Sequence, residues 1–370
     1  MIETRVEMPK VRVRSASEDV AQFAARGLEQ MFDREKQLFC FTLRQAEGHM
    51  VREGLSPRYT MMTLLGLHRF ERAGEKSPVE ILPSLERMMS DTSWIDNIGD
   101  LGCLLWTCGV IAPEHYAQLV EKLDARHALD HYLDAKQGTT MELAWYLTGL
   151  CYGLNSGEAQ LRDLAEPARA TYGLLTANQG AKGVFGHMAR ASSLAGRLRG
   201  KVGSFADQVY PIYAFSQFGK FTGEQEPMLR AMDCARTICE HQGPFGEWWW
   251  HYDSATGAIA ETYPVYSVHQ DGMAPMALYA LSDVTGTDFS HWIGKGLEWI
   301  RGNNDLSCDM RSESAQVIWR NFYLPGAQRL VRQVLGASRE PGQVPVEKLK
   351  VNHECRPYEL GWALYGLAGR

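Results

Sequence analysis

The chain has 370 residues, of which 45% are hydrophobic and 22% are charged, so it can bury a sizeable core and is not intrinsically disordered. Its formal net charge of -6 argues against the basic surface that general nucleic-acid binding needs, and we expect no nucleic-acid partner. No run approaches the roughly 20 apolar residues of a membrane span, so we expect no membrane-spanning segment.

Residues 1–15 alternate charged and short apolar residues and lack the apolar stretch of a secretory signal. We interpret them as an N-terminal extension of a single domain that comprises residues 1–370. The eight cysteines are scattered without a CxxC pair, and several lie in apolar helical runs, as is typical of buried reduced thiols. These features together predict a cytoplasmic protein.

Six apolar segments rich in Gly and Ala recur along the chain, starting near residues 59, 99, 141, 205, 271 and 358. The two most similar are residues 141–150 (MELAWYLTGL) and 358–367 (YELGWALYGL). Helices that are apolar on nearly every face are buried all round. Between them lie amphipathic segments with surface-helix patterning, at residues 79–89, 113–123, 158–175, 224–240 and 289–301. This alternation predicts an all-α fold, an (α/α)6 toroid in which a ring of inner helices is wrapped by outer ones.

Two long loops between these helices carry candidate binding residues. Residues 178–204 contain six glycines and no acidic residue, which is unusual in an acidic protein. We interpret this loop as a mobile lid that could hold an anionic group, through Arg197, Arg199 and Lys201 among its basic residues. A solvated surface loop is the alternative interpretation.

The second loop, residues 243–270, has aromatic and β-branched residues around a Gly-bearing turn at 253–257, and this pattern predicts a β-hairpin over one mouth of the barrel. Its rings could stack on a sugar or stabilise a carbocation, or they could simply pack the loop. The candidate substrate-binding residues here are Trp248, Trp249, Trp250, His251, Tyr263 and Tyr266.

An acidic residue stands at or near the start of five of the six inner segments: Asp100, Glu142, Asp207, Asp271 and Glu359. If all inner helices run the same way, these carboxylates converge on one end of the cavity, where mutual repulsion would give them different pKa values. One raised and one ordinary carboxyl group suit general acid and general base catalysis, and Glu142 with Asp271 is the preferred pair. The alternative is helix capping, because acidic residues favour helix N-termini.

His269 precedes Asp271 by two residues and is a further candidate acid or base, with a hydrogen-bonded structural role as the alternative. A zinc site built from Cys308, Asp309, His353 and Cys355 fits no ligand spacing that is typical of zinc. We therefore predict no metal and no cofactor.

The inner repeats and the acidic row, over roughly residues 55–370, resemble the (α/α)6 toroid superfamily. It includes six-hairpin glycosidases, polysaccharide lyases, sugar epimerases and terpene-cyclase or prenyltransferase-like proteins. Residues 242–248 (QGPFGEW) are similar to the QxxxGxW element of squalene-cyclase-like repeats, with a degenerate copy that begins at Gln179. In that family the element ties an outer helix to the next inner one, so it implies fold rather than activity. The DxDD and DDxxD acidic motifs of terpene enzymes are not found in the sequence.

The resemblance implies a carbohydrate-active enzyme that is a hydrolase, lyase or epimerase, with a small-molecule or oligosaccharide substrate that could be anionic. The first alternative is a terpene-cyclase-like or prenyltransferase-like enzyme, and the second is a catalytically silent toroid that binds a glycan or a protein partner. Among possible cavities, an open polar cleft with paired carboxylates would favour the sugar enzyme. A closed aromatic pocket with one buried acid would favour the terpene enzyme.

Overall fold

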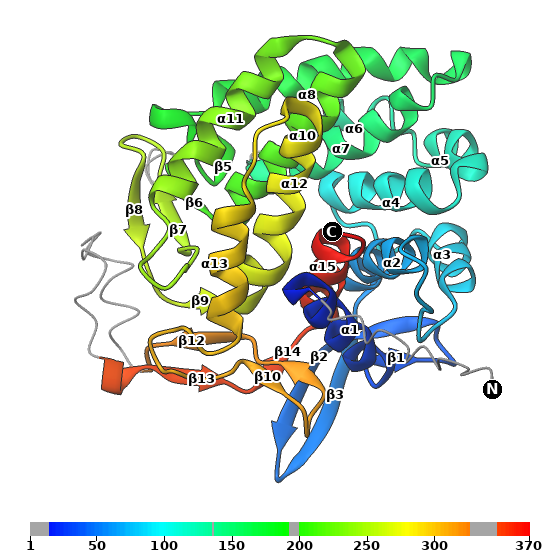
Figure 1. Ribbon diagram of the computed structural model, residues 1–370. Coiled ribbons are helices and arrows are strands. Elements are labelled where there is room, and N and C mark those ends of the chain that lie inside the picture. Colours follow the sequence, from blue (N-terminus) through cyan, green and yellow to red (C-terminus); the bar gives the residue numbers. More distant parts are fainter. Residues whose placement is uncertain (1–14, 135–136, 192–199, 326–345) are drawn as a thin grey trace, which may run out of the picture.

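The computed structural model describes residues 15–134, 137–191, 200–325 and 346–370. Six inner helices form a ring in which each contacts the next and the last contacts the first (Figure 1). In ring order they are α2 (Pro57–Arg72), α4 (Ile98–Ile111), α7 (Thr140–Asn155), α10 (Ala206–Thr222), α12 (Ala274–Thr285) and α15 (Pro357–Leu367). The predicted (α/α)6 toroid is confirmed, and all six predicted inner segments lie in these helices or at their first turn.

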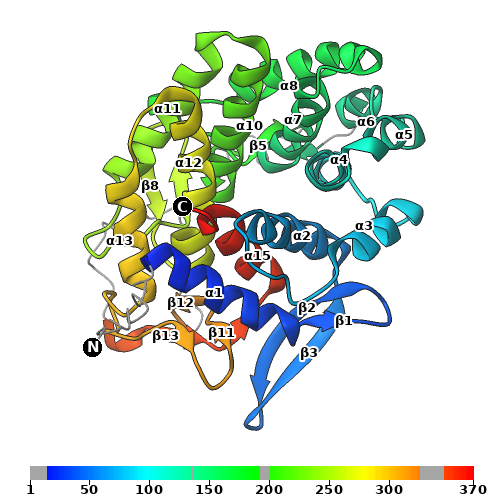
Figure 2. The same cartoon turned by 45° about the vertical axis from the view of Figure 1, so that its right-hand side comes forward.

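The outer layer consists of helices that pack around this ring. They are α1 (Ala16–Glu29), α3 (Ile81–Ser90), α5 (Tyr116–Lys122), α6 (Ala128–Asp134), α8 (Ala165–Ala177), α11 (Gln225–Glu240) and α13 (Ser290–Ile300). The five predicted surface segments all overlap this layer. Helices α1 and α6 are outer helices that the sequence analysis did not predict, and α1 lies against α15 (Figure 2). Helix α1 begins with a capping box between Ser15 and Glu18.

Glycine allows the inner helices to approach one another closely. A Cβ on Gly102 of α4 would lie 2.3 Å from the Cα of Tyr146 in α7. At the seam where the ring closes, a Cβ on Gly66 would lie 2.0 Å from the carbonyl oxygen of Gly361. Real Cβ atoms cannot come this near, so the Gly-rich composition of the inner segments follows from helix packing.

Several small antiparallel sheets lie outside the ring of helices, although the sequence predicted only one β-hairpin. The strands are β1 (Phe32–Asp33), β2 (Leu38–Ala46), β3 (His49–Leu55), β4 (Gln137–Thr139), β5 (Met188–Ala191), β6 (Val202–Ser204), β7 (His251–Asp253), β8 (Ala258–Glu261), β9 (Val265–Tyr266), β10 (Arg311–Ser312), β11 (Val317–Ile318), β12 (Asn321–Tyr323), β13 (Lys350–Asn352) and β14 (Glu354–Cys355). The predicted hairpin is β7–β8, which turns at residues 254–257 and pairs with β6.

The sheets gather at the end of the ring where the inner helices begin. Strands β3, β4, β6 and β14 each run into an inner helix within two residues. Strand β9 leads into a π-helical turn, His269–Met273, that precedes α12. We call this end the N-terminal mouth. The remaining short helices have 3-10 geometry and are η1 (Pro113–His115), η2 (Ala159–Leu164), η3 (Ala181–Gly183) and η5 (Val346–Lys348).

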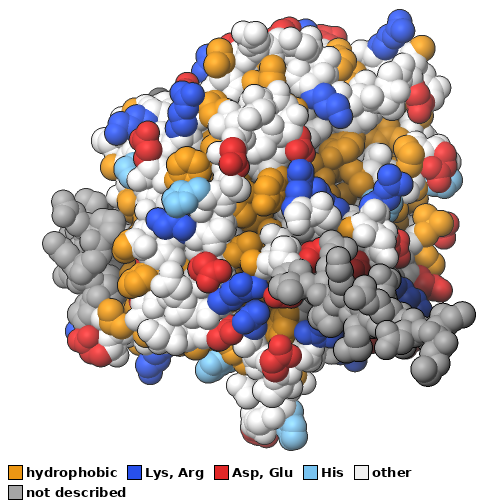
Figure 3. All heavy atoms as spheres, in the orientation of Figure 1, with side chains coloured by type: hydrophobic (Ala, Val, Ile, Leu, Met, Phe, Trp, Pro, Cys, Tyr) orange, Lys and Arg blue, Asp and Glu red, His pale blue; other side chains and the backbone are white. Residues whose placement is uncertain are grey.

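The described surface carries charges of both signs, and the cysteines form no disulfides. On the face shown in Figure 3, acidic and basic side chains of the described residues are interspersed. None of the helices in the described ranges is both long and apolar enough to cross a membrane. All eight cysteines are unpaired, and all except Cys308 are buried.

Candidate active site

Two adjoining cavities lie at the N-terminal mouth. The inner cavity has a volume of about 260 Å³ and the outer one about 400 Å³, and both are lined by Trp250, Tyr266 and Arg320. The walls of the inner cavity are mainly aromatic and thioether side chains: Tyr59, Trp145, Tyr210, Tyr358, Met62, Met141 and Met273. Arg58 and Arg320 are its charged lining residues. We call the two cavities together the cleft.

Asp100 forms a bidentate ion pair with one of these lining arginines. Nε and Nη2 of Arg58 donate to its two carboxylate oxygens at 2.6 and 2.9 Å, and the carboxylate is buried. The side chain of Asn97 caps α4 by accepting from the backbone N–H of Asp100. Because both oxygens of Asp100 are engaged, its contribution is to hold the Arg58 guanidinium at the cavity wall.

Asp271 and Glu359 are buried below the cleft and line neither cavity. Burial, reinforced by the neighbouring Glu359, raises the pKa of Asp271 well above its ordinary value. Burial also raises the pKa of Glu359, against the opposing charge of Arg320, whose Nε lies 3.6 Å from Oε1. Glu359 accepts the backbone N–H of Arg356 through its other oxygen, so it also caps α15.

Glu142 is the half-buried carboxylate of the acidic row. It forms a capping box at the start of α7, in which Oε2 accepts from the backbone N–H of Thr139 at 3.1 Å and the Thr139 hydroxyl accepts from its own N–H. Its Oε1 has no hydrogen-bond partner among the described residues, and the adjacent Met141 lines the inner cavity. Capping and an accessible carboxylate oxygen are therefore combined in one side chain.

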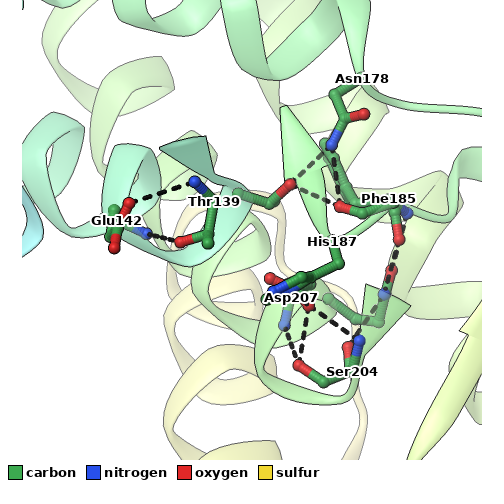
Figure 4. Close-up of polar contacts among 10 residues, drawn as sticks. Thr139, Glu142, Asn178, Phe185, His187, Ser204 and Asp207 are labelled. Carbon is green, nitrogen blue, oxygen red and sulfur yellow. Dashed lines mark hydrogen bonds and ion pairs between the residues drawn. The ribbon is translucent and has the colours of Figure 1, made fainter. Parts of the chain in front are cut away.

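Asp207 is paired with a histidine that sequence reasoning missed (Figure 4). Nδ1 of His187 donates to Oδ2 of Asp207 at 3.0 Å, and this hydrogen bond is the main cause that raises the pKa of His187. The charge of Glu142 raises it further. Asp207 is 1% exposed, whereas the side chain of His187 is 45% exposed, so the pair presents its imidazole to solvent.

Hydrogen bonds fix His187 beside the start of α7. Its backbone carbonyl accepts the N–H of Thr140, and the Asn178 amide bridges the Thr140 hydroxyl and the Gly186 carbonyl (Figure 4). Little in the sequence indicates this pair, because His187 precedes Asp207 by 20 residues. His187 also lies in the loop at 178–204, whose composition pointed only to its Lys and Arg residues.

The three consecutive tryptophans have different environments. Trp248 and Trp249 are buried and line neither cavity, whereas Trp250 is half-buried and lines both. The ring of Trp250 stacks on His251 with centroids 4.3 Å apart, and Nδ1 of His251 donates to Glu261 at 2.8 Å. Tyr263 lines the outer cavity. Of these candidate binding residues, Trp250, Tyr263 and Tyr266 lie at the cleft.

His269 lines the inner cavity but is 6% exposed. Burial lowers its pKa to about 3, so the ring is neutral and its Nδ1–H faces the Trp248 carbonyl at 3.5 Å. It packs against the rings of Phe205 and Tyr266. A neutral imidazole at this depth can accept a hydrogen bond through Nε2 but cannot supply a proton at neutral pH.

The basic loop at 178–204 lies partly outside the described residues, and so do Arg197 and Arg199. Lys201 is exposed and lines neither cavity. In the described part, glycines permit close packing: a Cβ on Gly203 would lie 2.1 Å from the Phe185 carbonyl oxygen. No group of three potential metal ligands occurs among the described residues.

The two QxxxGxW-like segments make the same contacts. Nε2 of Gln242 donates to the carbonyls of Gly246 and of Trp292 in α13, at 3.0 and 2.9 Å. Nε2 of Gln179 donates to the carbonyls of Gly183 and of Arg230 in α11, at 3.0 and 2.9 Å. Each glutamine thus ties the loop after one outer helix to the next outer helix.

No protein-family model matches the chain, and no curated protein matches it. Solved structures do. A possible member of the GH105 family from Salmonella enterica subsp. enterica serovar Paratyphi A is 12% identical with a TM-score of 0.61, covering 100% of this chain and 98% of that one. A GH76A alpha-1,6-mannanase from Salegentibacter sp. HEL1_6 is 12% identical with a TM-score of 0.62, covering 96% and 98%. An unsaturated glucuronyl hydrolase specific for heparin is 15% identical with a TM-score of 0.57, covering 95% of each chain. Over nearly its whole length, this chain therefore shares the (α/α)6 toroid fold of these proteins.

Proposed function

We propose that this protein is a carbohydrate-active enzyme that uses Glu142 and the His187–Asp207 pair as general acid and base. The observation that carries the proposal is that these groups lie directly beside residues of the inner cavity wall: Met141 precedes Glu142, and Ser204, which bonds Asp207, lines the cavity. The cavity itself is walled by aromatic rings and arginines. Aromatic faces suit the apolar faces of sugar rings, and arginines hydrogen-bond hydroxyl or carboxylate oxygens. The named activities of the structural neighbours add an analogy at the level of the fold.

The two groups suit complementary roles in hydrolysis. His187, whose pKa is raised by Asp207, can donate a proton to the departing glycosidic oxygen. The accessible oxygen of Glu142 can then activate a water molecule or attack the anomeric carbon. Elimination or epimerisation would use the same groups, with one of them removing a proton from a ring carbon. Asp271, the other half of the preferred pair, is buried and lines neither cavity, and burial raises its pKa, which suits it to support Glu359 rather than to meet the substrate.

The test is turnover of a defined panel. It contains heparin, unsaturated uronic-acid disaccharides, α-1,6-mannan and neutral manno-oligosaccharides, with new reducing ends, loss of the unsaturated chromophore and changes in ring-proton NMR signals as separate readouts. Glu142→Gln and His187→Asn should each lower kcat/KM about 10²-fold or more, which is typical of losing an acid–base group.

Glu18→Gln is the matched control. Glu18 occupies the same capping-box position in α1 that Glu142 occupies in α7, but it lies on an outer helix. This substitution should cost a similar amount of helix stability and leave kcat/KM within about twofold of the wild-type value. The proposal fails if nothing in the panel is converted, or if Glu142→Gln and His187→Asn are as active as Glu18→Gln.

A prenyl-converting enzyme is the second candidate, because the aromatic walls of the inner cavity would also stabilise a carbocation. Asp271, whose pKa is raised by burial, is the acid such a reaction would need, and like Glu142 and His187 it does not itself line the cavity. Incubation with farnesyl and geranylgeranyl diphosphate distinguishes the two, since terpene products would appear only in this second case.

A further inference from the structure

The floor of the outer cavity carries an ordered row of polar and aromatic side chains. Strands β13, β12 and β9 form a three-stranded sheet in which Asn352 pairs with Asn321, and Asn321 pairs with Tyr266. Directly opposed residues project from the same face of a sheet. All three line the outer cavity, so the sheet presents two amides and a phenol ring in line.

Some polar atoms along this floor have no hydrogen-bond partner within the described part of the chain. Asn321 is 4% exposed and Arg320 is 9% exposed, yet Oδ1 of Asn321 and Nη1 of Arg320 accept or donate no hydrogen bond there. Arg356 also lines the outer cavity, and its buried Nε likewise has no hydrogen-bond partner among the described residues. These atoms have almost no exposed surface themselves, so a ligand hydroxyl meets them only when the side chains shift toward the cavity. A buried polar atom without a hydrogen bond costs about 1–3 kcal/mol, and this cost favours such a shift.

The guanidinium of Arg356 is held ready by other contacts. It lies over the ring of Phe41, 4.6 Å from the centroid, and its Nη1 donates to the Tyr59 hydroxyl at 2.8 Å. These two contacts fix the plane of the group, while Nε has no hydrogen-bond partner among the described residues. A side chain fixed before binding loses little conformational entropy when a ligand arrives.

The charges around the outer cavity balance. Arg320 and Arg356 are matched by Glu261 and Glu354, of which Glu354 lies 3.8 Å from Nη1 of Arg320. An anion would gain no net attraction here, and an apolar ligand would leave the amides and charged groups of the lining without hydrogen bonds. A neutral ring that bears both hydroxyl donors and acceptors matches the lining, with Trp250 and Tyr266 as surfaces for stacking.

We propose that the outer cavity is a second sugar-binding subsite, which takes a neutral hexose or N-acetylhexosamine residue linked to the ring in the inner cavity. The inference rests on the proposed function and makes it more specific, because it sets a disaccharide as the smallest good substrate. The Trp250 ring, which lines both cavities, then lies at the junction between the two sugar residues.

The test measures binding, so it does not depend on turnover. Mannobiose, cellobiose and N,N′-diacetylchitobiose are each titrated against the Glu142→Gln protein by calorimetry and by tryptophan fluorescence, beside mannose, glucose and N-acetylglucosamine. At least one disaccharide should bind about tenfold more tightly than its monosaccharide. Asn321→Ala and Asn352→Ala, each added to this protein, should remove that advantage and leave monosaccharide binding unchanged.

Two controls keep the outcome clear. Asn155→Ala changes an exposed amide at the end of α7 opposite the N-terminal mouth and should keep the disaccharide advantage. Asn352 is only half-buried, so its variant tests the subsite even if Asn321→Ala unfolds. The subsite is refuted if no disaccharide binds better than its monosaccharide, or if Asn352→Ala retains the advantage. Turnover in the earlier panel without a disaccharide advantage refutes the subsite alone, whereas a disaccharide advantage without turnover refutes the catalytic proposal alone.

Discussion

Oδ2 of Asp207 accepts three hydrogen bonds at once, from Nδ1 of His187 at 3.0 Å and from the backbone N–H and hydroxyl of Ser204 at 2.8 Å each. The Ser204 contacts hold the carboxylate in place at the start of α10, so that it meets the imidazole in a fixed geometry. The pair joins two inner-helix starts, because the backbone of His187 is bonded to Thr140 of α7.

This relationship predicts the pH dependence of activity. If protonated His187 is the acid, kcat/KM should fall as the pH rises through its pKa, which Asp207 raises above the ordinary value of 6.5. Asp207→Asn removes the charge and should move this alkaline limb to lower pH. The stabilising contribution of the pair has the same sign: it is complete below the pKa of unfolded histidine and is lost as the pH rises through the folded value.

The measurements are kcat/KM against pH and an NMR titration of the His187 ring. Asp124→Asn is the control, because Asp124 forms a similar contact with the exposed His127, 2.7 Å between Oδ1 and Nδ1, away from the cleft. An alkaline limb that stays in place in Asp207→Asn would show that another group supplies the proton.

Asp271→Asn should leave catalysis largely intact and change the pH dependence of stability. Burial raises the pKa of the Asp271 carboxyl, so the wild-type protein loses stability as the pH rises from the ordinary aspartate range through the folded value. An asparagine has no such proton to lose, and the variant should gain relative stability at alkaline pH. Urea unfolding between pH 5 and pH 9 measures how the stability of the wild type and of the variant depends on pH. A large loss of kcat/KM in the variant would instead show that Asp271 belongs to the catalytic pair.

The sequence was sufficient for the ring and insufficient for the chemistry at its mouth. Six all-apolar segments separated by amphipathic ones leave few folds that bury every apolar face, so the toroid followed from patterning. Helix α1 was missed because it precedes the first repeat and resembles an isolated surface helix. The acidic row lies at the predicted ends of the helices, but its members have different environments that depend on partners distant in sequence, such as Arg58 for Asp100 and Arg320 for Glu359. The His187–Asp207 pair depends on the path of a loop, which periodicity does not describe.

The ion pair between Arg58 and Asp100 should contribute measurably to stability. Asp100 is 2% exposed and Arg58 is 36% exposed, so the pair is only partly screened by solvent. Asp100→Asn should cost about 1–3 kcal/mol of unfolding free energy, below the roughly 3–5 kcal/mol of a fully buried pair. Asp283→Asn breaks the more exposed bidentate pair with Arg370 and should cost less than about 1 kcal/mol. Equal losses in urea unfolding would mean that burial of Asp100 adds nothing to its pair.

Gly66→Ala should be among the most damaging single-methyl changes in the chain. The added Cβ would meet the backbone of Gly361 at 2.0 Å, and backbone at the seam of a closed ring can move only if neighbouring helices move with it. Overpacking of a well-packed core typically costs about 1–3 kcal/mol, and we expect the upper end or more here. Gly173→Ala is the matched control, because Gly173 also lies within a helix, α8, and a Cβ there would meet nothing within 4 Å. That variant should gain up to about 1 kcal/mol from helix propensity, so the two melting temperatures should move in opposite directions.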